Sequence, residues 1–270
     1  MKNFEIFESL ADFSRALNTR EVNATYGKYE DDELPSRRPD VGGKWYGTPD
    51  YQTADSLLLG GDKKSAAKIQ KALSQCRIKA DKAQTPTNAL YCSQQGFTPN
   101  MGRVLAGHPQ NMFNVRRETR DSSKVVTLVF NSGTSGDVTA AKKIDMGVKV
   151  LTTIYQLERA GERCNLYVGT VNQDNGTNYT YTTFVKVKDA GKPLDVTRLA
   201  YTFANPSFHR RHMFAWRERC QGYNDTQMGF SVLGREAKAE LSKNRKFVGA
   251  IYIDYENYNR DIKQLAECRI

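Results

Sequence analysis

The feature that most constrains the fold of this chain is a change of apolar periodicity between residues 125 and 188. The run VVTLVF at 125–130 is rich in β-branched residues and is typical of a strand buried on both faces. Residues 138–160 repeat apolar side chains at spacings of three and four, which predicts one long amphipathic helix. The run RCNLYVGTV at 163–171 predicts a second strand, parallel to the first because a crossover helix separates them.

Two further runs complete the predicted sheet. Asn175 and Gly176 indicate a tight turn, and the alternating residues 179–188 then predict a strand antiparallel to the second one. A last strand is predicted within residues 247–253, in the run FVGAIYI. The sequence therefore predicts an α/β fold whose mainly parallel sheet contains one antiparallel hairpin strand.

The residues before this sheet follow a different pattern. Apolar spacing and helix start and stop signals predict helices over residues 4–18, over 51–59 and from residue 62 onward. Residues 81–124 carry several Gly and Pro without periodicity and are expected to be irregular. The chain is thus expected to consist of a helical and irregular segment at 1–123 and an α/β domain at 124–270.

Composition limits the classes of function. A hydrophobic fraction of 39% in 270 residues is typical of a globular protein with a core. No apolar run approaches the roughly 20 residues that cross a bilayer, so a cytoplasmic protein without membrane contact is expected. Forty Lys and Arg against 30 Asp and Glu give a net charge of +10, which favours contact with a polyanion. Five widely spaced cysteines without a C-x-x-C pair favour reduced thiols.

The polar bend NSGTSGD at 131–137 follows the first strand, where α/β proteins place ligand sites. With the long helix ending in LERAGERCNLYV and the antiparallel strand after it, this order resembles a von Willebrand factor A-like domain over residues 124–258. The resemblance implies a Rossmann-like sheet and a divalent ion held by Asp-x-Ser-x-Ser at the end of the first strand. Here the matching positions are Asn131, Gly133 and Ser135, so an amide replaces the anchoring carboxylate and the first hydroxyl is missing.

A reduced set of oxygen ligands remains at this strand end. It consists of Asn131, Ser135, Asp137 and Asp254, the last of which closes the final predicted strand. Losing the anchoring charge weakens divalent binding, because the ion exchanges water for poorer ligands. No cofactor is therefore expected, with Mg²⁺ as the weak alternative. The bend also lacks both the P-loop and the G-x-G-x-x-G pattern, and a helix cap formed by Ser135 or Asp137 is the simpler interpretation.

A second resemblance covers most of the chain. The segments WYGTPDYQTADSLLLGGD, FTPNMGRVLAGHPQNM, LERAGERCNLYV and FANPSFHRRHMFAWRER are similar in sequence and spacing to a family of uncharacterised tailed-phage and prophage proteins. This resemblance implies a viral origin, and hence a place in the host cytoplasm or in the virion. It implies no chemistry.

Basic residues offer a separate hypothesis. The run HRRH at 209–212 places two histidines on one helix face, but the arginines between them disfavour a bound cation. Arg116, Arg117, Arg210 and Arg211 could instead form a basic surface for nucleic acid. The alternative for the HRRH helix is an exposed basic face with aromatic residues packed beneath it.

Three functions follow from these patterns. The favoured one is a non-enzymatic protein–protein interaction or scaffolding protein, whose partner binds the strand-end surface around Asn131, Ser135, Asp137 and Asp254. The first alternative is a nucleic-acid-binding protein that uses the four arginines. The second is a divalent-metal-dependent hydrolase at the strand end. Catalytic residues are not assigned, because no nucleophile motif such as G-x-S-x-G is present.

Overall fold

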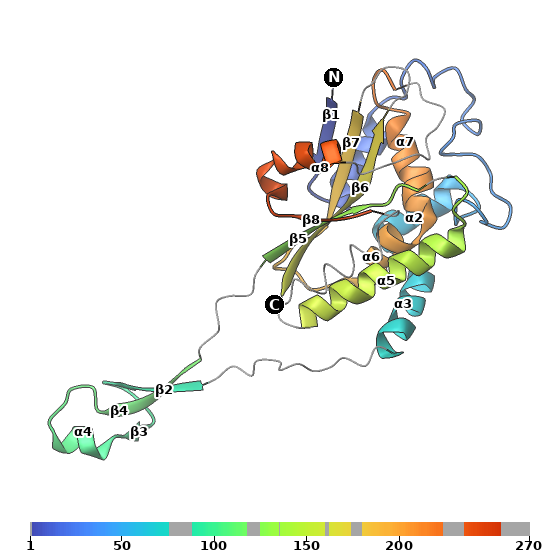
Figure 1. Ribbon diagram of the computed structural model, residues 1–270. Helices are drawn as coiled ribbons and strands as arrows, with labels where there is room; N and C mark the ends of the chain where they lie inside the picture. The colour runs from blue at the N-terminus through green and yellow to red at the C-terminus, as the bar shows by residue number, and fades with distance from the viewer. Residues whose placement is uncertain are drawn as a thin grey trace.

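A five-stranded mixed sheet forms the centre of the molecule (Figure 1). The computed structural model describes residues 2–75, 88–117, 125–134, 136–159, 162–173, 180–223 and 235–254. Across the sheet the strands are β1 (Lys2–Phe7), β7 (Thr180–Lys188), β6 (Arg163–Gln173), β5 (Val125–Asn131) and β8 (Ile251–Ile253). Strand β5 is parallel to both β6 and β8, and β7 is antiparallel to β6. The predicted α/β fold with a mainly parallel sheet is thus confirmed, with β1 added parallel to β7.

Helices cover the two faces of this sheet unequally. The larger core packs the sheet against helices that include α1 (Leu10–Thr19), α2 (Tyr51–Gly60), α3 (Lys63–Gln75), α5 (Ala140–Arg159), α6 (Val196–Ala204), the π-helix η1 (Phe208–Met213) and α7 (Phe214–Arg217). The smaller core, on the other face, lies under α8 (Arg235–Ser242) and the 3₁₀ turn η2 (Arg245–Phe247). None of the helices within the described residues is both long and apolar enough to cross a membrane.

Helix α5 confirms the long crossover helix predicted for residues 138–160. It lies so close to α6 that a Cβ atom at Gly147 would stand 2.3 Å from the carbonyl oxygen of Phe203. Glycine is therefore required at this crossing, because a larger residue would push the two backbones apart. Helix α6 ends before Asn205 and Pro206, as the helix-breaking pair predicts.

The N-terminus differs from the prediction. The structure replaces the helix expected over residues 4–18 with strand β1 and the shorter helix α1. Ser9 separates the two, since its hydroxyl accepts a hydrogen bond from the Asp12 backbone amide at 3.1 Å and caps α1. Phe4 packs toward the smaller core and Phe7 toward the larger, as alternation in a strand requires. A short apolar run fits both periods, which explains the error.

The expected boundary at residue 123 does not separate two cores. Phe13 of α1, Leu58 of α2 and Ile69 of α3 are buried in the same cluster as Phe130 of β5 and Leu151 of α5. The N-terminal helices and β1 therefore belong to the α/β unit, which we call the main body.

Residues 88–117 form a small separate sheet, which we call the lobe. Its elements are β2 (Asn88–Ser93), β3 (Thr98–Pro99), α4 (Met101–Leu105) and β4 (Met112–Arg117). The strands are antiparallel in the order β2-β4-β3. Figure 1 shows the lobe standing apart from the main body. Irregular structure is expected here from the Gly and Pro residues, which obscure the short strand and helix signals between them.

Candidate functional site

The carboxyl end of β5 is the strand end that the sequence singles out as a site. Because β5 and β8 are parallel neighbours, Asn131 and Asp254 meet there, and the Asn131 amide donates to an Asp254 carboxylate oxygen at 3.2 Å. The Asn131 side-chain oxygen accepts from the Gly133 backbone amide at 3.2 Å, which fixes the bend after the strand. Both side chains are buried, with exposed fractions of 0% and 2%.

The structure thus brings together two of the four predicted strand-end residues. Asp137 lies in the loop before α5 and is exposed. Ser135 lies outside the described residues. A partner that approached this end would meet Asp137 and not the buried pair.

A lysine that the sequence analysis does not select lies beside the same strand end. Lys143, in the first turn of α5, is buried and donates through Nζ to the Ser132 carbonyl oxygen at 3.0 Å. The same Nζ lies 3.1 Å from Nδ1 of His209 in η1. On the other side of the imidazole, Nε2 lies 3.4 Å from a guanidinium nitrogen of Arg217. The sequence does carry a signal, because Lys143 occupies the apolar stripe of α5 with Met146.

The hydrogen bonds among Lys143, His209 and Arg217 determine where the protons of these side chains lie. A guanidinium only donates, so Nε2 of His209 accepts from Arg217 and the single proton of the neutral ring is on Nδ1. That proton points to Lys143, which can accept it only as an uncharged amine. Burial lowers the pKa of Lys143 well below its usual value, and the charges of Arg210 and Arg217 lower it further. Burial likewise lowers the pKa of His209, as do the same neighbouring cations.

This electrostatic environment weighs against a divalent ion. Arg210 and Arg217 are cationic, and both lie close enough to the strand end to lower the pKa of Lys143 and of His209. Within the part of the chain that the structure describes, no cluster of three His, Cys, Asp or Glu side chains could hold a metal ion. The hydrolase stays a prediction, but its metal would have to bind against these charges.

Arg210 and Arg211 are buried, with exposed fractions of 1% and 0%, which corrects the expectation that they face solvent. Arg210 donates to the carbonyl oxygens of Trp45 at 2.6 Å and Val138 at 2.5 Å, and its guanidinium stacks on the Trp45 ring at 4.2 Å. Arg211 donates to four oxygen atoms of the irregular segment 36–48. These arginines hold the segment 36–48 and the loop before α5 against η1, and their buried guanidinium groups are not available to nucleic acid in this fold.

The two histidines of HRRH belong to different networks. His212 lies 2.7 Å from the Tyr201 hydroxyl through Nδ1 and 3.7 Å from the Asp55 carboxylate through Nε2. His209 instead contacts Lys143, as described above. Burial lowers the pKa of His212, although Asp55 opposes that shift. The structure therefore does not bring His209 and His212 to a common ligand.

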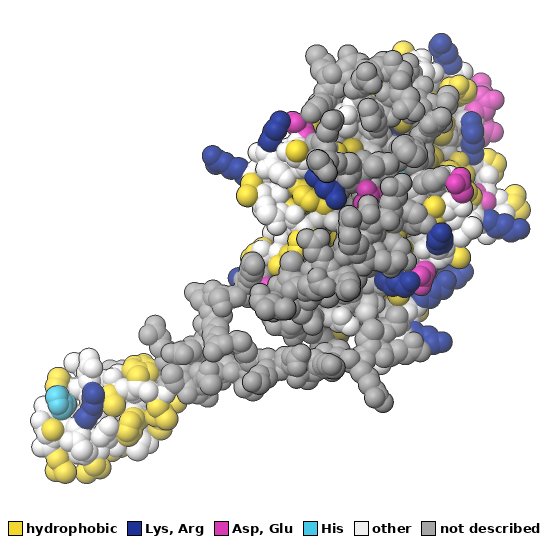
Figure 2. Space-filling model, in the orientation of Figure 1, with side chains coloured by type: hydrophobic (Ala, Val, Ile, Leu, Met, Phe, Trp, Pro, Cys, Tyr) yellow, Lys and Arg dark blue, Asp and Glu magenta, His cyan; other side chains and the backbone are white. Residues whose placement is uncertain are grey.

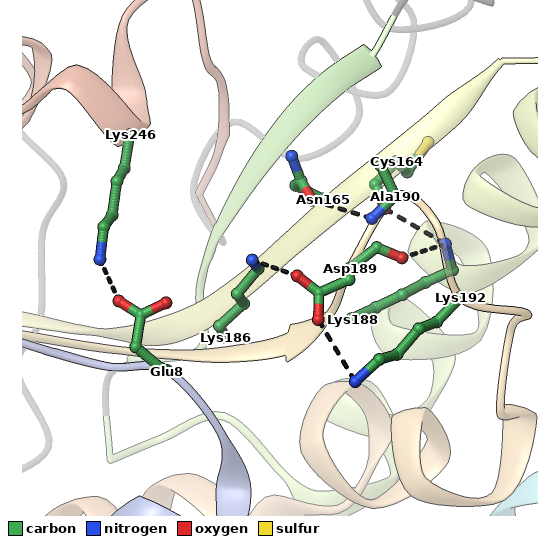
Figure 3. A network of polar contacts seen from close by, with 9 residues as sticks. All are labelled: Glu8, Cys164, Asn165, Lys186, Lys188, Asp189, Ala190, Lys192 and Lys246. Carbon is green, nitrogen blue, oxygen red and sulfur yellow. Dashed lines mark hydrogen bonds and ion pairs between the residues drawn. The ribbon is translucent and has the colours of Figure 1, made fainter.

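At the opposite end of the sheet, charged side chains neutralise one another (Figure 3). Lys188 of β7 donates to the carbonyl oxygens of Cys164 and Asp189, both at 3.2 Å, and forms an ion pair with Glu158. The Asp189 carboxylate pairs with Lys186, which lowers the pKa of Asp189. Because the charges are already paired, this end offers less to a charged ligand.

The lobe presents a surface of a different kind. Seven of the twelve exposed large apolar side chains of the described residues lie in it: Leu90, Tyr91, Phe97, Met101, Val104, Leu105 and Val115. Their exposed fractions range from 38% for Val104 to 84% for Leu105. No buried apolar side chain of the described chain belongs to the lobe. Figure 2 shows these apolar side chains gathered over it. Concentrations of this kind mark interaction sites.

The apolar side chains of the lobe are ordered by its secondary structure. Leu90 of β2 and Val115 of β4 are directly opposite in the strand register and share one face. Met101, Val104 and Leu105 follow helical spacing on α4 and share one side of it. The lobe therefore offers two short apolar strips, one on a sheet and one on a helix.

Comparison with known proteins places the whole chain in one family. A family model described as Domain of unknown function (DUF7192) matches residues 2–269. The chain belongs to this family. The matched residues include those of the lobe as well as those of the main body. None of the curated proteins matches the chain, and none of the solved structures does. The resemblances to von Willebrand A-like domains and to phage proteins stay predictions.

Proposed function

We propose that this member of the DUF7192 family is a non-enzymatic protein–protein interaction protein that binds its partner through the lobe. The observation that carries the proposal is a 30-residue unit that exposes seven large apolar side chains and buries none. Full burial of one such side chain is worth about 1.5–3 kcal/mol, so a partner that covers several of them would gain substantial binding energy.

The charge of the lobe indicates what kind of surface would cover it. Residues 88–117 contain Arg103, Arg116 and Arg117 and no Asp or Glu. A complementary partner therefore carries an apolar patch with carboxylates at its rim. The lobe would supply the apolar centre from α4 and from the β2–β4 face.

A protein partner fits this lobe better than a nucleic acid does. Base stacking uses aromatic rings, and the lobe exposes two of them, Tyr91 and Phe97, beside five aliphatic side chains. Three arginines would release few counterions, so the log–log salt slope for single strands would be no steeper than about −2. Tight binding of mixed single-stranded DNA or RNA at 0.15 M salt, with a steeper slope, would favour the nucleic-acid alternative.

The lobe is also a better docking surface than the strand end that the sequence predicts. Asn131 and Asp254 are buried there and bonded to each other, which leaves Asp137 as the exposed member of the described set. The lobe, by contrast, needs no rearrangement to expose its apolar side chains.

Photo-crosslinking in the cells that naturally make the protein tests the proposal. A benzoylphenylalanine at Leu105 should give a discrete protein adduct, whereas the same group at Val248, which is 68% exposed on the main body, should not. Met101→Glu should remove the Leu105 adduct, because it places a carboxylate in the apolar strip. Equal adducts from the two positions, or an adduct that survives Met101→Glu, would contradict docking through the lobe.

A further inference from the structure

Strand β1 closes one edge of the five-stranded sheet. Its six residues pair with β7 from Lys2 opposite Thr180 to Phe7 opposite Val185. Among the described strands, β7 is the one that pairs with β1, so the other edge of β1 faces away from the sheet. Backbone N–H and C=O groups on such an edge can hydrogen-bond to another extended chain.

A groove runs along this edge. Its volume is about 650 Å³, and its lining comes from Phe4, Glu5, Ile6 and Phe7 of β1, from Ala16, Thr19 and Arg20 at the end of α1, and from Trp216. Phe4 and Ile6 point to one face of the sheet and Phe7 to the other. Because side chains from both faces of one strand line it, the groove lies at the strand's edge and not on a face of the sheet.

A smaller cavity shares two lining residues with the groove. It measures about 230 Å³ and is lined by Glu5, Arg20, Tyr181, Thr183, Cys220 and Gln221. Glu5 and Arg20 border both spaces and pair at 3.1 Å, with the Arg20 guanidinium 4.8 Å from the centre of the Trp216 ring. The groove thus has an aromatic wall and one exposed ion pair beside an extended backbone.

We infer that this groove binds an extended segment of a partner protein, which adds to β1 as a sixth strand of the sheet. The occupant follows from the chemistry of the edge. A row of backbone N–H and C=O groups along an extended strand is matched by the backbone of another extended peptide. Alternate side chains of the added segment would reach the Trp216 wall on one face and the Phe4 side on the other. The site is independent of the lobe, and with it the chain would join two partners or two parts of one.

A random 12-residue peptide display library, selected against the full chain, supplies the probe. Enriched peptides should bind the wild-type chain in fluorescence anisotropy and bind Thr19→Trp at least tenfold more weakly, since the indole would fill the groove. The matched control is Asn18→Trp, which adds the same ring one residue away, outside the lining, and should bind like wild type. Both substitutions are at exposed positions of α1, so the fold should tolerate them.

Backbone recognition has its own readout. Analogues of the selected peptide, N-methylated at alternate residues in the two possible phases, keep the side chains and remove one set of donors. One phase should lose binding and the other should keep it. Equal binding of both phases, no difference between Thr19→Trp and Asn18→Trp, or no enriched peptide would overturn the inference. Weaker binding to Leu105→Glu than to wild type would show that the peptides bind the lobe, which separates this test from that of the proposed function.

Discussion

Replacing Lys143 by methionine tests the arrangement at the strand end most directly. If Lys143 accepts the His209 proton at neutral pH, it is uncharged in the folded chain, whereas in the unfolded chain its pKa is about 10.4. Folding then releases one proton. Since the pKa of Lys143 is lowered in the folded chain, the unfolded state binds more protons at any pH between the folded and the unfolded pKa. Across that range the free energy of unfolding rises by about 1.4 kcal/mol per pH unit.

The size of the effect at one pH depends on opposing terms. An uncharged Lys143 reduces stability at pH 7 by roughly 4–5 kcal/mol relative to a pH near its unfolded pKa. Lys143→Met removes that penalty, but it leaves the Ser132 carbonyl and the His209 N–H without their partner, at about 1–3 kcal/mol each. These terms nearly offset each other, so the pH dependence is more informative than the stability at a single pH.

Urea unfolding followed by tryptophan fluorescence measures this difference. From pH 7 to pH 8 the wild-type free energy of unfolding should rise by about 1.4 kcal/mol more than that of Lys143→Met. Lys142→Met, at the exposed neighbouring position on α5, should keep the wild-type slope. Parallel pH profiles for wild type and Lys143→Met would refute the uncharged amine and the hydrogen-bond order derived from it.

Other expected outcomes concern packing, acid stability and the lobe. Gly147→Ala should destabilise the chain by about 2 kcal/mol in urea titrations, because the cost of overpacking against α6 exceeds the helix-propensity gain of about 1 kcal/mol. Gly60→Ala should not destabilise it, because the space around Gly60 is open. The pKa values of His209 and His212 are lowered, so the contribution of these two rings to stability is constant above about pH 6.5 and falls below it, by up to about 1.4 kcal/mol per pH unit for each ring. Thermal unfolding from pH 7 to pH 5 measures this loss. Leu105→Glu should change the melting temperature little, since the side chain is 84% exposed, so that a loss of crosslinking in such a variant reports docking and not unfolding.

The sequence predicts the centre of the fold well because its periodicities there are long and unambiguous. The helix expected over residues 138–160 holds, since twenty residues of helical spacing exclude a strand. The predicted parallel pairing of β5 with β6 and antiparallel pairing of β6 with β7 hold as well. Strand β1 is too short for its period to be read, and its pairing with β7 joins residues about 180 positions apart. Such non-local pairing leaves no trace in a local pattern.

The candidate sites are less predictable than the fold, for a related reason. Asn131 and Asp254 are correctly placed together because parallel strands end at one edge of a sheet. Lys143 reads as a surface lysine until His209 and Ser132 are seen to bond it. Arg211 reads as surface charge, since nothing local shows that an irregular segment will wrap around its guanidinium.

The polar groups at the carboxyl end of β5 are bonded within the protein, whereas the lobe and the edge of β1 are not covered in this way by the described residues. The carboxyl ends of parallel strands expose polar groups that a metal, a ligand or the protein itself must satisfy. Here the protein supplies them: Asp254 accepts from Asn131, and the amine of Lys143 donates to the Ser132 carbonyl. The lobe and the edge of β1 differ from this strand end. The lobe exposes apolar side chains, which an apolar protein surface would cover, and β1 has an open edge, to which another extended chain could bind. A strand end that the protein satisfies internally, an apolar lobe and an open strand edge together support the proposed role in protein–protein interaction.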